Sequence, residues 1–88
     1  IRGGEVDIIC KDKDVLVFVE VKARYSHEYG LPSESITPWK ISALKKSAIF
    51  YIVKTGWGNK PYRIDFIGID YADSKEFPVI ELVKNITQ

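Results

Sequence analysis

The stretch VLVFVEVKAR, residues 15 to 24, constrains the fold of this chain more than any other. β-branched residues recur at every second position from Val15 to Val21, which is the period of a β-strand. Glu20 and Lys22 nevertheless place a negative and a positive charge in this apolar strand. An ionised group is costly to remove from water unless it is paired, hydrogen-bonded or bound to a metal. The chain must therefore fold so that both charges are satisfied.

A second apolar run precedes this strand, and the polar cluster KDKD separates the two. Apolar β-branched runs on both sides of such a cluster predict a β-hairpin. We expect a turn centred on residues 12 and 13, which would place Asp7 opposite Phe18 and Glu5 opposite Glu20. A slip by one residue would move the Asp7 carboxylate to the valine side, into the core. The pattern thus predicts one face shared by Glu5, Asp7, Glu20 and Lys22.

The composition is that of one soluble globular domain over residues 1–88, with 45% hydrophobic and 28% charged residues. No segment approaches a membrane span or a secretory signal, so we expect no membrane partner. Cys10 is the only cysteine, which excludes an internal disulfide and favours a reducing, cytoplasmic compartment. Its position after Val6, Ile8 and Ile9 predicts a small core residue.

The segment TPWKISALKKSAIFYIV predicts an α-helix. Thr37 can cap its start, Pro38 suits the first helical position, and Gly56 marks its end. Its buried face is expected to consist of Ile41, Leu44, Ala48 and Ile52. YRIDFIGID and FPVIELVKNI have strand composition, and RYSHEYGLPSES reads as a loop. The order β, β, loop, α, β, β predicts an α/β domain with a sheet packed against a helix.

Three carboxylates gathered on one face would repel one another unless a cation lies among them. Oxygen ligands of this kind suit Mg²⁺, with Mn²⁺ close behind. Lys22 would hold a water molecule or stabilise negative charge on a phosphorus. The simpler alternative is a surface ion pair between Glu20 and Lys22, with Asp7 solvated nearby. The apolar neighbours on that face, Ile9 among them, speak against it.

Asp7, a turn, and then Glu20-Val21-Lys22 resemble the PD-(D/E)xK motif of restriction-endonuclease-like nucleases. The segments RGGEVDII, VLVFVEVKAR, ITPWK, YRIDFIGI and IELVKNI are similar, in this order, to the YraN-like family of small bacterial proteins. That family is regarded as endonucleases and likened to Holliday-junction resolvases. The resemblance covers nearly the whole chain and implies a restriction-endonuclease-like core with a mixed sheet of about four strands.

The resemblance also implies roles for individual residues. Asp7 and Glu20 correspond to the metal-binding acids, and Lys22 corresponds to the motif lysine. Val21 would offer its carbonyl as a further ligand, and Glu5 would be an outer metal or water ligand.

The chain departs from the family pattern in two places. The family begins with an N-terminal helix that often bears another acid, and we expect this domain to lack that helix. Many relatives in the wider superfamily carry a glutamine or lysine followed four residues later by a tyrosine. Lys40 occupies the first position here, but Leu44 stands at the second.

Positive charge is concentrated in the middle of the chain. Residues 22 to 63 carry eight basic and two acidic groups, whereas residues 1 to 21 carry three basic and five acidic groups. A basic segment beside an acidic site would bring a polyanion to that site. The candidate nucleic-acid contacts are Arg24, Lys40 and Lys45. A solvated lysine face explains the same pattern.

Four further residues invite a functional or a structural interpretation. Trp39 is expected to pack at the helix start, and Trp57, between two glycines, to be the exposed aromatic that stacks on bases. His27 has no His or Cys partner nearby in the sequence for zinc and is a weak candidate for a catalytic base. Asp65 is expected to pair with Arg63 rather than to bind a metal.

We therefore expect a Mg²⁺-dependent DNA endonuclease that acts on branched or structured DNA. Cutting two strands would be easiest for a twofold homodimer. The alternative is a non-catalytic nucleic-acid-binding or assembly module that retains the nuclease fold, because a fold does not establish an activity.

Overall fold

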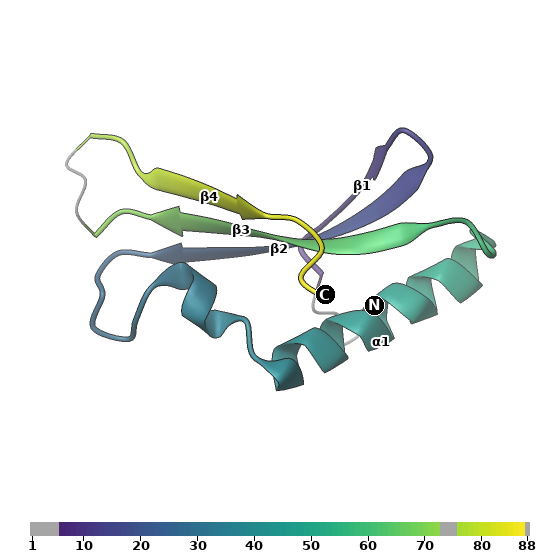
Figure 1. Cartoon of the computed structure of the whole chain (residues 1–88), viewed down its shortest axis with the longest axis horizontal. Coiled ribbons are helices and arrows are strands. Elements are labelled where there is room, and N and C mark those ends of the chain that lie inside the picture. Colours follow the sequence, from purple (N-terminus) through teal and green to yellow (C-terminus); the bar gives the residue numbers. More distant parts are fainter. Residues whose placement is uncertain (1–5, 73–75, 88) are drawn as a thin grey trace.

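The computed structural model of the chain describes residues 6–72 and 76–87. It contains, in chain order, β1 (Ile8–Asp12), β2 (Val15–Arg24), the 3₁₀ helix η1 (Pro32–Ser35), α1 (Pro38–Thr55), β3 (Tyr62–Asp70) and β4 (Val79–Val83). The four strands form one sheet in the order β1-β2-β3-β4, with α1 and η1 on the same side of it (Figure 1). The predicted α/β fold with a four-stranded mixed sheet is confirmed, and it is consistent with a restriction-endonuclease-like core.

The strand directions follow from the connections between the strands. β1 and β2 form an antiparallel hairpin, and β3 and β4 are also antiparallel. β2 and β3 run parallel over nine residue pairs, from Leu16–Tyr62 to Arg24–Asp70. A parallel pair needs a long crossover connection, usually a helix, and α1 supplies it.

The hairpin register differs from the predicted one by two positions. Ile9 lies opposite Phe18 rather than Leu16, and the turn consists of Lys13 and Asp14. Asp12 is thereby drawn into β1, where its Oδ2 accepts a hydrogen bond of 3.2 Å from Nη1 of Arg63. This contact with a distant strand cannot be seen in the local pattern. Because the shift is an even number of residues, every side chain keeps its predicted face.

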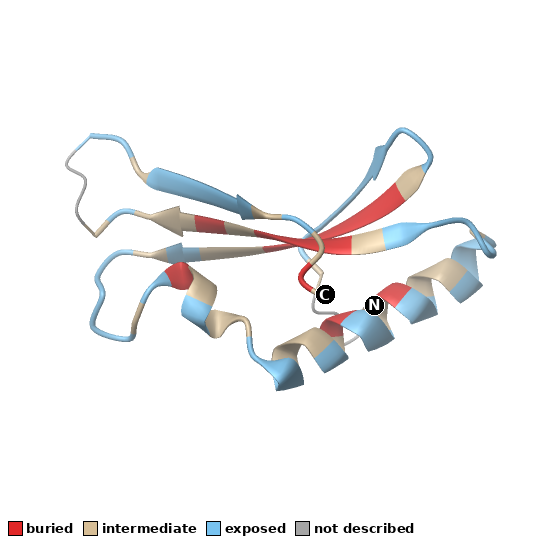
Figure 2. Cartoon of the chain, viewed as in Figure 1, coloured by how far each residue is buried: buried red, intermediate tan, exposed pale blue. Residues whose placement is uncertain are grey.

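The core lies between α1 and the face of the sheet that carries Leu16 and Phe18 (Figure 2). Four side chains in it are fully or almost fully shielded from solvent: Phe18, Phe66, Leu44 and Ile64. Leu44 and Ala48 are buried, and Ile41 and Ile52 pack against them, which confirms the predicted buried face of the helix. Alternation on β2 thus directs Glu20 and Lys22 toward the same side as the core.

Both ends of α1 have the predicted chemistry. The Thr37 hydroxyl accepts a hydrogen bond of 3.1 Å from the backbone N–H of Lys40, and Pro38 is the first helical residue. Gly56 ends the helix in the left-handed region at φ +73°, which a residue without Cβ adopts at little cost. Within residues 6–72 and 76–87, no helix combines the length and apolarity needed to cross a membrane.

Three predictions about burial were wrong. Cys10 is exposed, because it lies on the edge strand β1 and points to the face of the sheet away from α1. Trp39 is 78% exposed, since it lies on the outer side of the first turn of α1. Trp57 is instead partly buried and packs against the core, because the chain folds back beneath the helix terminus toward β3.

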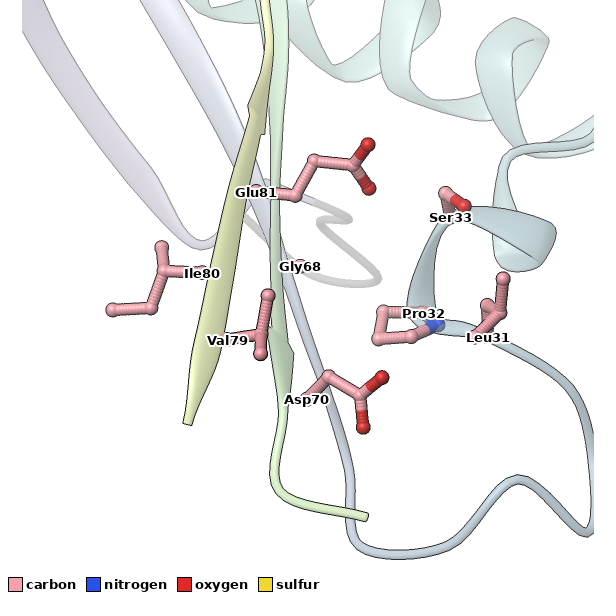
Figure 3. Close-up of a pocket in the computed structure, with 8 residues that line it drawn as sticks. All are labelled: Leu31, Pro32, Ser33, Gly68, Asp70, Val79, Ile80 and Glu81. Carbon is pink, nitrogen blue, oxygen red and sulfur yellow. The ribbon is translucent and has the colours of Figure 1, made fainter. Parts of the chain in front are cut away.

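η1 packs tightly on the middle of β3 at Gly68. A Cβ at this position would lie 2.9 Å from Cβ of Pro32 and 3.1 Å from a ring carbon of Phe66. Beside this contact, a cavity of about 390 Å³ separates η1 from the ends of β3 and β4 (Figure 3). Gly68 therefore allows the approach of η1 that closes one wall of this cavity.

We predict that Gly68→Ala lowers the free energy of unfolding by about 1–3 kcal/mol, the usual cost of forcing an extra methyl group into a packed site. Urea denaturation measures this loss. The same substitution in a Pro32→Gly background, which lacks the opposing Cβ, should cost less. An equal loss in both backgrounds would show that the close approach of η1 is not the cause.

Candidate functional site

Asp7 and Glu20 meet at the end of the β1–β2 hairpin. Asp7 immediately precedes β1, and the next step of the ladder after the Ile8–Val19 pair places it beside Glu20. The Asp7 backbone N–H donates to the Val19 carbonyl at 3.1 Å. The Val21 N–H in turn donates to Asp7 Oδ2 at 2.9 Å. The Asp7 carboxylate is therefore held against β2 by a backbone donor, on the face predicted from the alternation.

Glu20 is a buried acid with a basic partner. It is only 8% exposed, and its Oε2 lies 2.8 Å from Nζ of Lys40, in the first turn of α1. A buried carboxylate needs such a partner because its hydration is lost. The crossover helix thus delivers Lys40 to the acid of the central strand. Lys40 had been predicted as a nucleic-acid contact, and in this structure its ammonium group contacts the site itself.

The two carboxyl groups titrate in opposite directions. A hydrogen bond from Glu20 lowers the pKa of Asp7, helped by the Val21 N–H and the charge of Lys40 and opposed by burial. Burial raises the pKa of Glu20, helped by its hydrogen bond with Asp7 and opposed by Lys40. Two like charges so close do not both ionise readily, so proximity separates the pKa values of the two groups. A cation between them would relieve this repulsion.

Lys22 lies two residues beyond Glu20 on the same face of β2 and is half-buried. Within the described part of the chain, its ammonium group makes no hydrogen bond or ion pair. Its neighbour on β3 is Gly68, which has no side chain to cover it. The amine is therefore free to contact a molecule bound beside the two carboxyl groups.

The Val21 carbonyl adds a third oxygen on the same side. The N–H and C=O of one strand residue point to the same neighbour, and the Val21 N–H points to Asp7. β1 begins only at Ile8, so among the described residues no strand partner takes up this carbonyl. Two carboxylates and a carbonyl are hard oxygen donors that suit Mg²⁺ or Mn²⁺. Among the described residues no group of three His, Cys, Asp or Glu gathers, and Glu5 lies outside them.

The structure does not bring the other two predicted nucleic-acid contacts to the carboxyl groups. Lys45 is exposed on α1. Arg24 ends β2 two residues beyond Lys22, and its Nε is buried without a hydrogen-bond partner among the described atoms. These positions leave the two residues on the same side of the sheet as the site, at a distance from Glu20 along the helix and the strand.

Asp65 is structural, as predicted. It is 3% exposed and accepts hydrogen bonds from Nε of Arg63 at 3.0 and 3.1 Å and from the Asn85 N–H at 3.0 Å. Its side chain points to the face of the sheet opposite Glu20, since it is paired with Val19. Asp65 therefore ties the chain after β4 to β3 and takes no part in the site.

His27 has a partner that could not be predicted from the sequence. Nε2 of His27 lies 2.7 Å from Oδ2 of Asp70, at the end of β3. The Ala72 N–H and then His27 lower the pKa of Asp70. The two residues are 43 positions apart, and only the parallel pairing of β2 with β3 brings their strand ends together. This contact anchors the loop after β2 and lies two strand positions beyond Lys22.

Comparison with known proteins shows which family this chain belongs to. The model of the uncharacterised protein family UPF0102 matches residues 1–69. The chain belongs to this family. A UPF0102 protein from Clostridium botulinum (strain Hall) is 45% identical over 86 residues, which cover 97% of this chain and 70% of that protein. One from Dehalococcoides mccartyi (strain BAV1) is 44% identical over 82 residues, which cover 93% of this chain and 66% of that protein.

The UPF0102 segment matched by the family model contains Asp7, Glu20, Lys22 and Lys40. The family name describes no reaction and no ligand. The predicted relation to PD-(D/E)xK nucleases therefore remains a prediction, which depends on the chemistry of these four side chains.

We predict that Glu20→Gln stabilises the metal-free protein at pH 7, by on the order of 1 kcal/mol. The pKa of Glu20 is raised on folding, so folding takes up a proton and stability falls as the pH rises through the folded pKa. Glutamine keeps the hydrogen bonds and carries no charge. The gain should vanish below about pH 4, where the acid is protonated in both states.

Urea denaturation in EDTA at acidic and neutral pH measures this difference. Glu81→Gln on β4 is the control, because it removes one exposed negative charge without touching the pair. If Glu20→Gln instead destabilises the protein at pH 7, the ion pair with Lys40 outweighs the burial of the acid and Glu20 is a structural residue.

Proposed function

We propose that this protein is a metal-dependent endodeoxyribonuclease of the PD-(D/E)xK type that uses Mg²⁺ or Mn²⁺. The observation that carries this proposal is the contact between the Asp7 and Glu20 carboxyl groups, with Lys22 unpaired on the same face. Two neighbouring acids in a partly buried site are a good ligand set for a hard cation. They are a poor choice for stability alone, since burial penalises the charge of Glu20.

Each residue has a distinct task in the proposed reaction. Asp7, Glu20 and the Val21 carbonyl would hold the cation. When bound, the cation acidifies a coordinated water molecule and screens the charge of a phosphate. Lys22 would orient the attacking water and stabilise negative charge on the phosphorus. Lys40 favours the ionised form of Glu20, because it lowers the pKa that burial raises, and so it prepares the acid for a cation.

DNA is the substrate that we propose, in branched or structured form and in the cytoplasm. Arg24, Lys40 and Lys45 offer positive charge along the face that carries the site, so phosphate contacts would dominate affinity. A twofold homodimer would place two such sites on the two strands of a duplex. The DNA backbone would not pass through the cavity beside η1. Asp70 and Glu81 point into this cavity and would repel phosphate (Figure 3).

One observation favours the alternative, a non-catalytic nucleic-acid-binding module. Oε2 of Glu20 is already engaged by Lys40 at 2.8 Å, so the acid is satisfied without a metal. In that case the charges would stabilise the sheet and the helix start, and the basic residues alone would bind nucleic acid. The two functions differ in what happens when metal and DNA are supplied together.

We predict that the protein cleaves branched DNA with Mg²⁺ or Mn²⁺, and that Asp7→Asn, Glu20→Gln and Lys22→Met each slow cleavage by at least about 100-fold. Gel analysis of labelled four-way junctions and linear duplexes measures the rate. EDTA should abolish cleavage, and the metal should restore it.

The matched controls remove the same charges from residues that lie away from the site. Asp12→Asn alters the other end of β1, and Lys54→Met alters the last turn of α1; both should cleave at close to the wild-type rate. Absence of cleavage by the wild type with either metal, or equal rates for Lys22→Met and Lys54→Met, would rule out the nuclease and leave the binding module.

A further inference from the structure

A second cavity lies at the opposite end of α1 from Glu20. It has a volume of about 260 Å³ and is lined by Lys11, Asp14, Trp57, Lys60 and Pro61. These residues come from two distant parts of the chain, the tip of the β1–β2 hairpin and the connection from α1 to β3. Figure 1 shows both segments at the end of the sheet where α1 terminates. The cavity is therefore a product of the tertiary fold.

The indole of Trp57 is held in a defined position in this cavity. Its Nε1–H donates to the Pro61 carbonyl at 3.3 Å, and its backbone N–H donates to the Ile52 carbonyl at 3.1 Å. The ring packs on the edge of the core and remains partly exposed. An aromatic ring that is oriented by a hydrogen bond and partly exposed is suited to stacking.

Two ammonium groups are placed over this ring. Nζ of Lys60 lies 4.9 Å from the ring centroid, and Nζ of Lys11 lies 5.8 Å from it. Cation–π attraction favours these positions, although a lysine head group is strongly hydrated and gains little at an exposed site. Asp14 is the one acid in the lining, so the cavity has a net positive charge.

We infer that this cavity binds one nucleotide of an unpaired nucleic-acid strand. A flat aromatic ring beside lysines is the combination that proteins use for single strands, because bases stack on the ring and phosphates contact the lysines. The volume is just below the range of about 300–1,000 Å³ that drug-sized ligands occupy, which suits a single base. Asp14 can accept a hydrogen bond from an exocyclic amino group of that base.

An acidic peptide would satisfy the lysines but would gain nothing from the indole, and Asp14 would repel it. A nucleotide uses all three features. Among polyanions, the lining therefore favours nucleic acid.

The distance between this cavity and the Asp7–Glu20 carboxyl pair indicates which form of DNA could reach both. This step rests on the proposed function. Lys40 contacts Glu20, and α1 continues to Thr55, two residues before Trp57. At 1.5 Å per residue, the cavity lies about 25 Å from the site along the helix. At about 3.4 Å per base pair, this is roughly seven base pairs of duplex. The substrate is then DNA with an unpaired strand about seven base pairs from the point of cleavage.

We predict that, in EDTA, Lys11→Ala/Lys60→Ala weakens binding to a duplex with a 12-nucleotide overhang roughly tenfold, and binding to the blunt duplex much less. Fluorescence anisotropy of labelled oligonucleotides measures both affinities. The salt dependence of log K should lose about 0.7 for each lysine removed.

Lys54→Ala is the matched control, because Nζ of Lys54 lies 5.7 Å from the ring of Phe50 at the same end of α1 but does not line this cavity. If Lys54→Ala lowers the DNA affinity as much as alanine at either cavity lysine, general positive charge explains the binding. That result would overturn the inference. So would absence of DNA binding by the wild type.

A second readout follows the ring itself. Trp39 and Trp57 are the two tryptophans of the sequence, so Trp57 can be observed alone in a Trp39→Phe background. Oligo(dT) should quench its fluorescence, and poly-glutamate of the same charge should not. Quenching by both polymers would identify an acidic-peptide site instead.

The two proposals fail separately. Binding is measured without metal, so Asp7→Asn, which should slow cleavage strongly, should leave the Trp57 quenching intact. Cleavage without quenching would refute the cavity alone, and quenching without cleavage would refute the nuclease alone.

Discussion

The parallel pairing of β2 with β3 is the constraint on which the rest of this structure depends. It runs over nine residue pairs and cannot form without a crossover, so α1 must lie across one face of the sheet. That placement buries Phe18 and Phe66 beneath the helix and brings the first turn of the helix to Glu20. The core and the candidate site are two consequences of one connection.

The candidate site places a carboxyl group in the core, where burial of a charge is unfavourable for stability. Glu20 continues the row of core side chains on β2 and is almost as buried as its apolar neighbours. It retains a charge-bearing group there with the help of Lys40, while burial and its hydrogen bond with Asp7 raise its pKa. An apolar residue at this position would pack on the same core without that cost. The same burial gives the carboxyl pair its unusual titration and its fitness as a cation ligand.

Much of the fold was predictable because it depends on local chemistry. Thr37, Pro38 and Gly56 marked the helix ends, and the spacing of Leu44 and Ala48 marked its buried face. Burial on the sheet was harder to predict. Cys10 looked like a core residue by its neighbours, but exposure depends on which face a helix covers, and the sequence of one strand does not contain that information.

The sequence by itself determined which side chains of the candidate site share a face. Asp7, Glu20 and Lys22 follow from alternation, and this result survived a register error of two positions because the period of a strand is two. Only the tertiary structure decided their partners. Lys40 on Glu20, His27 on Asp70, and Lys11 on Trp57 join segments that are 20 to 46 residues apart. Such contacts are set by how the strands and the helix pack, a global property that no local pattern records.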